Sequence, residues 1–220
     1  MNNTIDVWNI HLPDCRVEVE LCRSLLADEE LARAAKFFKP KDADRFILCR
    51  GLLRRILGEL LETDPSALVF SRNEHGKPFL ADTDVEFNVS HSRDRLLVAV
   101  SSGRALGVDI EFRRSGINMD AIAERWFAPE ERAFFRGLEN PEEGFFDIWA
   151  KKEAYVKALG IGIFKELHAF AVPLGDAPGF PSIGKNGEWF FQTLEIDPAY
   201  AAALVSKAPA VPVNLKTISF

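Results

Sequence analysis

The stretch that decides the fold reads Gly107-Val108-Asp109-Ile110-Glu111 and lies near the middle of the chain. Because side chains alternate along a β-strand, Val108 and Ile110 point to one face while Asp109 and Glu111 point to the other. Two carboxylates on one face are good ligands for a hard cation such as Mg²⁺. The pair alone fits equally well a strand with one core face and one solvated face.

The segments on either side of this stretch predict an α+β fold. N-terminal to it, apolar periodicity and turn residues predict helices over 28–38 and 42–61, and strands over 5–10, 85–90 and 96–101. The stretch itself belongs to a strand over 105–112, which the turn Ser102-Gly103-Arg104 is expected to join to 96–101 as a hairpin. C-terminal to it we expect helices over 119–127, 129–136 and 142–159, the last stopped by Gly160, and strands over 189–196, 200–206 and 215–220.

Each side of the chain therefore offers helices followed by short antiparallel strands. This order predicts two similar α+β halves related by pseudo-twofold symmetry, 1–102 and 103–220, with the carboxylates in the second half. A repeat at the level of residue identity is not evident to support the division.

Composition excludes several classes of protein. The 220 residues carry a formal net charge of −6, which argues against a general nucleic-acid binder. Three cysteines form no zinc pattern with the four histidines and indicate reduced thiols. No signal peptide is evident, and no apolar run approaches the roughly 20 residues of a membrane helix. We expect a soluble, cytoplasmic protein that contacts neither nucleic acid nor membrane.

The predicted helix over 142–159 carries a second group of polar residues. Glu153 shares an apolar stripe with Trp149 and Val156, where a carboxylate is costly unless it meets a cation or a metal. Lys157 lies one turn further on and could bind a phosphate. An ordinary Glu–Lys pair at i, i+4 explains the same spacing.

A third group follows the pattern Phe87-Asn88-Val89-Ser90-His91-Ser92. His91 at a strand end could donate to a phosphate oxygen, although histidines in such places are more often loop hydrogen-bonders. Arg33, Arg45 and Lys77 could supply further cations, and each could equally be ordinary solvated charge.

Taken together and in this order, the motifs F-N-x-S-H-S, G-V-D-I-E and W-x-x-K-E-A-x-x-K resemble the signature of the 4′-phosphopantetheinyl transferase family. The likeness runs from about Leu25 to Ser206 and is to the longer, pseudo-dimeric (Sfp-type) branch. The resemblance implies transfer of 4′-phosphopantetheine from coenzyme A to a serine of an apo acyl or peptidyl carrier protein, leaving 3′,5′-ADP. It also implies a monomer, and this branch tends to serve secondary metabolite biosynthesis.

The resemblance further implies the roles of particular residues. Mg²⁺ would be held by Asp109, Glu111 and Glu153, with Glu153 also a proposed base for the serine proton. Catalysis would rest on Glu153, Lys157 and Asp109. Coenzyme A would be bound by Arg33, Arg45, Lys77, Pro78, Ser90, His91, Lys152 and Lys157.

Two other functions use the same residues. A Mg²⁺-dependent hydrolase of a nucleotide or diphosphate would turn over its small molecule without a carrier protein. A non-catalytic module that binds coenzyme A or a carrier protein would not require a complete set of metal ligands.

Overall fold

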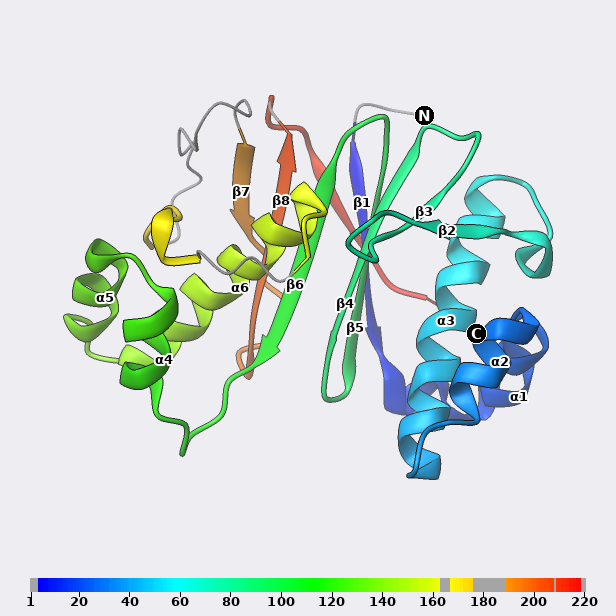
Figure 1. Ribbon diagram of the computed structural model, residues 1–220, viewed down its shortest axis with the longest axis horizontal. Coiled ribbons are helices and arrows are strands. Elements are labelled where there is room, and N and C mark those ends of the chain that lie inside the picture. The colour runs from blue at the N-terminus through cyan, green and yellow to red at the C-terminus, as the bar shows by residue number, and fades with distance from the viewer. Residues whose placement is uncertain (1–3, 163–166, 176–188, 208, 219–220) are drawn as a thin grey trace.

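The computed structural model describes residues 4–162, 167–175, 189–207 and 209–218. Two β-sheets face one another at the centre of the molecule, and helices cover the outer face of each sheet (Figure 1). Three apolar clusters fill the gaps between these four layers: one under the N-terminal helices, one under the C-terminal helices and one between the two sheets. The α+β class predicted from the sequence is confirmed.

The first half contributes β4, β5 and β1 to a four-stranded sheet of order β4-β5-β1-β9, and its long helix packs on this sheet. Its elements in chain order are β1 (Ile5–His11), the 3-10 segment η1 (Leu12–Glu18), α1 (Val19–Ser24), α2 (Asp28–Ala34), α3 (Pro40–Leu60), η2 (Pro65–Ala67), β2 (Phe70–Arg72), β3 (Pro78–Leu80), β4 (Val85–Ser92) and β5 (Arg95–Ser102). The strands β2 and β3 form a small hairpin of their own.

The second half contains a three-stranded sheet of order β6-β8-β7 and the long helix α6. Its elements are β6 (Leu106–Phe112), α4 (Met119–Trp126), α5 (Pro129–Arg136), α6 (Pro141–Leu159), η3 (Leu167–Ala169), β7 (Trp189–Thr193) and β8 (Tyr200–Lys207). Helix α6 starts with proline in its first turn and stops at Gly160, which has the left-handed φ of 67° that glycine tolerates best. The predicted stop is confirmed.

Pseudo-twofold symmetry relates the two halves, because the strand orders β4-β5-β1 and β7-β8-β6 are equivalent. A duplicated buried ion pair supports the relation. Glu30 accepts a hydrogen bond from the backbone at the start of α2 and contacts Arg54 of α3 at 2.7 Å. Glu131 does the same at the start of α5 and contacts Lys152 of α6 at 2.8 Å. Both glutamates occupy the third helical position, where a carboxylate satisfies an otherwise free N–H.

The strand that carries Asp109 is built into the core between the sheets. Leu106, Val108 and Ile110 are buried there among residues of β1, β5 and β8. The alternation predicted for this strand is confirmed, since its apolar side chains share one face while Asp109 contacts α6 on the other. Burial of one whole face fixes the register of β6 strongly.

One predicted connection is wrong. The turn Ser102-Gly103-Arg104 does not close a hairpin, because β5 already has β4 on one edge and β1 on the other. The chain instead passes from the first sheet into the second, where β6 pairs with β8. The hairpin joins β4 to β5 through a turn at Arg93, whose φ is 48°.

The first predicted helix ends earlier than expected, at Ala34 rather than Phe38. Pro40 occupies the first turn of α3, and Lys39 before it is extended, as residues preceding proline usually are. The chain therefore cannot stay helical across this junction, and Phe38 is left almost fully exposed.

The final described strand is β9 (Val213–Lys216), whereas the sequence predicts 215–220; residues 219 and 220 lie outside the described part of the chain. It pairs in parallel with β1 of the first half. The division at residue 102 remains a prediction, and this strand crosses it. In the described residues, no helix is both long and apolar enough to cross a membrane.

Candidate active site

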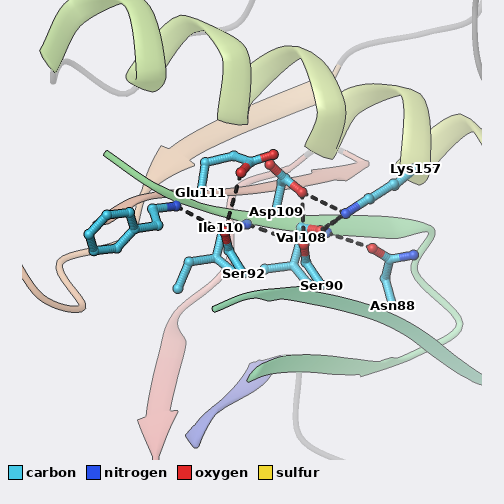
Figure 2. Close-up of polar contacts among 9 residues, drawn as sticks. Asn88, Ser90, Ser92, Val108, Asp109, Ile110, Glu111 and Lys157 are labelled. Atoms are coloured by element: carbon cyan, nitrogen blue, oxygen red, sulfur yellow. Dashed lines mark hydrogen bonds and ion pairs between the residues drawn. The ribbon is translucent and has the colours of Figure 1, made fainter. Parts of the chain in front are cut away.

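Three elements from both halves meet at the carboxylate of Asp109 (Figure 2). This side chain on β6 is only 3% exposed. Its Oδ1 accepts a hydrogen bond from Ser90 Oγ of β4 at 2.8 Å and one from Lys157 Nζ of α6 at 2.6 Å. Lys157 also donates to Ser90 Oγ at 2.9 Å. A cation and a hydroxyl thus replace the water that burial removes from this carboxylate, which lowers the cost of burying it.

Glu111 lies beside Asp109 on the same side of β6 (Figure 2). Its carboxylate accepts a hydrogen bond from Ser92 Oγ at 3.3 Å. Burial raises the pKa of Glu111, and the negative charge of Asp109 raises it further, while Lys157 opposes the shift. The carboxylate therefore lies in an environment that favours an added positive charge.

Glu153 of α6 faces the same region. Burial raises the pKa of Glu153, the charge of Asp109 adds to the rise, and Lys157 lowers it. The cation one turn away, Lys157, contacts Asp109 on the neighbouring strand, so its ion pair is not the ordinary i, i+4 pair with Glu153 that the spacing allowed. A pocket of about 290 Å³ is lined by Glu153 and Lys157 together with Lys77 and Pro78.

The three carboxylates have the chemistry of a hard-cation site. Among the described residues, no three His, Cys, Asp or Glu side chains are arranged closely enough to hold a metal ion as they stand. The second oxygen of Asp109, Oδ2, is buried and has no hydrogen-bond partner in the described chain. A buried carboxylate oxygen without a donor is costly, and a bound cation would satisfy it. The residues therefore fit Mg²⁺ in type.

Two of the predicted phosphate contacts lie near Lys157. His91 follows Ser90 at the end of β4, and Arg45 lies on the first turns of α3. Although the His91 side chain is solvent-accessible, desolvation by the surrounding protein lowers the pKa of its imidazole, and the charges of Arg45 and Lys157 lower it further. Arg45 contacts Asp42 at 2.6 Å, with both side chains more than a third exposed. Arg45 and Lys157 would attract an anionic ligand by charge, and a ring N–H of His91 could donate a hydrogen bond to it.

The other predicted ligand contacts are more spread out. Arg33 stacks on the ring of Phe46, 5.3 Å from its centre, and is not tied to the Asp109 cluster by any contact found in the described chain. Lys77 donates to the backbone carbonyls of Leu106 at 3.1 Å and Ala158 at 3.5 Å. Burial lowers the pKa of Lys77. Its ammonium thus links the β2–β3 hairpin of the first half to β6 and α6.

The structure places Lys152 away from the other residues that were predicted to bind coenzyme A. Its side chain is 0% exposed and lies on the other side of α6, in the core of the second half. It contacts Glu131 at 2.8 Å and donates to the carbonyls of Leu167 and Phe170, each at 2.7 Å. All three hydrogens of the ammonium have partners, so Lys152 has a structural role.

Sequence reasoning missed the importance of Asn88 and Ser92. Their side chains reach from β4 to the backbone of β6, as described below. A signal was present, because polar residues occupy every second position of 88–92 in a strand whose other positions are apolar or aromatic. Such polar side chains on a buried face need specific partners.

Comparisons with known proteins agree with this site. Residues 105–205 match the family model of the 4′-phosphopantetheinyl transferase superfamily, and residues 13–103 match that of the 4′-phosphopantetheinyl transferase N-terminal region. The transferase HetI of Nostoc sp. is 37% identical over 171 residues, which are 75% of this chain and 72% of HetI. The chain belongs to the 4′-phosphopantetheinyl transferase superfamily. The likeness to Sfp of Bacillus subtilis spans nearly the whole chain, with 29% identity over 222 residues that cover 97% of each protein.

A third relative, a putative 4′-phosphopantetheinyl transferase of Synechocystis sp., is 35% identical over 175 residues, covering 76% of this chain and 71% of its own. The resemblance drawn from the three motifs is therefore confirmed, including the long branch to which Sfp belongs. The chain is an enzyme, a 4′-phosphopantetheinyl transferase.

Proposed function

We propose that this transferase moves 4′-phosphopantetheine from coenzyme A to a serine of an apo acyl or peptidyl carrier protein and releases 3′,5′-ADP. The observation that carries the proposal is the convergence on Asp109 of Ser90 from the first half and Lys157 from α6, at 2.8 and 2.6 Å. The Asp109 carboxylate holds an ion pair with Lys157 and has a buried oxygen without a hydrogen-bond partner. When a ligand binds, its phosphate can replace Asp109 as the partner of the Lys157 ammonium.

The same proposal assigns Mg²⁺ to Asp109, Glu111 and Glu153. When bound, the metal would supply positive charge that neutralises the phosphate oxygens of coenzyme A. Its ligands come from a strand and a helix of the second half, which pack directly on one another.

The protein's own residues then have separate tasks. The serine oxygen of the carrier attacks the phosphorus of the phosphopantetheine, and the bond from that phosphorus to 3′,5′-ADP breaks. Glu153 accepts the serine proton at a carboxylate oxygen; its raised pKa makes it a better base than an ordinary glutamate. Lys157 turns from Asp109 toward the transferring phosphate and stabilises its charge.

Binding of coenzyme A rests on the cations around the site. We assign its phosphates to Arg45, His91 and Lys157, because the charges of Arg45 and Lys157 both act on the His91 imidazole. Lys77 and Pro78 line the 290 Å³ pocket and would contact the adenine through their apolar atoms. The hydroxyl of Ser90 already donates once and accepts from two groups, so it becomes available to a phosphate only when Lys157 moves.

The enzyme is proposed to work in the cytoplasm as a monomer. Its site draws residues from both halves of one chain, and a second copy is not needed to complete it.

Intact mass spectrometry of the carrier tests this function directly. The protein is incubated with coenzyme A, Mg²⁺ and an apo carrier protein, beside a Glu153→Gln variant and a sample with EDTA. We expect the carrier to gain one phosphopantetheine, about 340 Da by its formula, only in the complete sample. Cleavage of coenzyme A without labelling would instead establish the hydrolase. If coenzyme A binds but stays intact with both acyl and peptidyl carrier proteins, the protein is instead the non-catalytic binding module.

A further inference from the structure

Where the two facing sheets meet, β4 of one sheet lies beside β6 of the other. Each is the outermost strand of its sheet on this side, since the order is β4-β5-β1-β9 in one and β6-β8-β7 in the other. On its far edge β6 pairs with β8, so half of its backbone N–H groups point away from β8 toward β4. Buried N–H groups at such an edge need acceptors.

Side chains of β4 provide these acceptors in a regular ladder (Figure 2). The N–H of Val108 donates to Asn88 Oδ1 at 2.9 Å. The two following steps are Ile110 N–H to Ser90 Oγ at 3.3 Å and Phe112 N–H to Ser92 Oγ at 3.0 Å. Donor and acceptor are 20 residues apart in the chain at every step, so the two strands run in parallel with a fixed register.

Two steps of the ladder also hold the carboxylates of β6. Ser90 accepts from the backbone of β6 and donates to Asp109, and Ser92 accepts from the backbone and donates to Glu111 at 3.3 Å. A hydroxyl can do both because it has one hydrogen and two lone pairs. The same side chain therefore fixes where the strand lies and which way its carboxylate points.

We propose that Asn88 and Ser92 are positioning residues, which hold the two halves in register so that the carboxylates of β6 face the site, and that Ser92 orients Glu111. The role of Glu111 as a metal ligand rests on the proposed function; the ladder itself does not. Asn88 contacts no carboxylate, and its contribution is to the register alone. Groups that orient metal ligands typically affect metal affinity or activity by about 10- to 100-fold.

Amide hydrogen exchange on the metal-free protein tests the ladder without any activity. In Ser92→Ala we expect the N–H of Phe112 to exchange about fivefold faster or more, because its acceptor is gone. Ser92→Thr keeps the hydroxyl and should keep the protection. The control is Ser101→Ala on β5, which removes a hydroxyl that is more buried than that of Ser92 and donates to the Arg104 carbonyl, not to β6. It should leave the Phe112 N–H unchanged.

A Mg²⁺ titration of the transfer reaction tests the orientation of Glu111. The Mg²⁺ concentration for half-maximal rate should rise about tenfold in Ser92→Ala, return in Ser92→Thr and stay unchanged in Ser101→Ala, with the KM for coenzyme A unaltered. A merely structural loss would act alike in both alanine variants. An equal rise in both of them would overturn the orienting role.

The exchange experiment decides the ladder even if the wild-type protein transfers nothing. Unchanged exchange of the Phe112 N–H in a folded Ser92→Ala variant would overturn the proposal. If that variant does not fold, Asn88→Ala takes its place with the N–H of Val108 as readout. Faster exchange at Val108 alone supports the ladder, and no change there refutes it. A wild type without transfer, but with the expected exchange, would fault only the proposed function.

Discussion

Gly107 lies where β6 and α6 touch most closely, and alanine at this position should damage both folding and activity. A Cβ atom built on Gly107 lies 2.1 Å from the carbonyl oxygen of Ala154 and 2.3 Å from the nitrogen of Ala158. Both atoms belong to the backbone of α6, so neither can turn aside as a flexible side chain would. An ordinary contact begins near 3.4 Å, and the strand and helix must therefore separate by about 1.3 Å.

This separation sets the size of the effect. Overpacking of a core usually costs about 1–3 kcal/mol, and a clash with helix backbone belongs at the upper end of that range. The movement also pulls Lys157 from Asp109, whose contact is 2.6 Å. A displacement of about 1 Å at reacting groups typically lowers a rate about 100-fold. We expect both losses in Gly107→Ala.

Chemical denaturation and the carrier-labelling rate measure the two effects separately. Gly137→Ala is the matched control, because Gly137 has a φ of −83° and its added Cβ would meet atoms only at 3.4 Å or beyond. That variant should stay within about 0.5 kcal/mol of wild type. Wild-type stability and rate in Gly107→Ala would refute the reasoning that close approach of β6 and α6 builds the site.

Three further predictions concern charges. Lys152→Met should lose about 3–5 kcal/mol of stability because its buried partner Glu131 is left unpaired, and Mg²⁺ should not restore this loss. Lys157→Met should lose stability that Mg²⁺ does restore. Thermal unfolding of both variants with and without Mg²⁺ measures the difference. Because the pKa values of Glu111 and Glu153 are raised, protons compete with the metal at a higher pH than they would at ordinary glutamates. In Mg²⁺ titrations across a pH series, the Mg²⁺ concentration for half-maximal rate should rise as the pH falls through these raised pKa values and stay level above them. Arg45→Ala should raise the KM for coenzyme A about tenfold with an unchanged melting temperature, since the ion pair it loses is exposed.

Local pattern was enough to predict much of the site. The alternation of 106–111 separated the core side chains from Asp109 and Glu111, and the stop at Gly160 follows from backbone sterics that need no tertiary information. The position of Glu153 on an apolar stripe likewise marked it as a residue in need of a cation.

Tertiary contacts explain the failures. Neighbouring residues on a helix point about 100° apart, so Lys152 and Glu153 cannot both face one site. Which of them turns inward depends on Glu131, a residue of another helix that only the folded chain brings near. The pairing of β6 with β8 could not be predicted from the sequence either, because β8 lies far along the chain and the nearer β5 is an alternative partner. Local turn chemistry cannot decide that competition.

The pairing of β9 with β1 has a consequence for how the protein is made. Ile5 pairs with Val213, and Lys216 closes an ion pair with Asp6 at 2.6 Å. As the ribosome extends the chain, β1 is synthesised long before β9, the strand that pairs with one of its edges. Contacts of such long range form slowly, and an open strand edge invites pairing with other chains meanwhile. The first half is thus completed only when the second half has already been made.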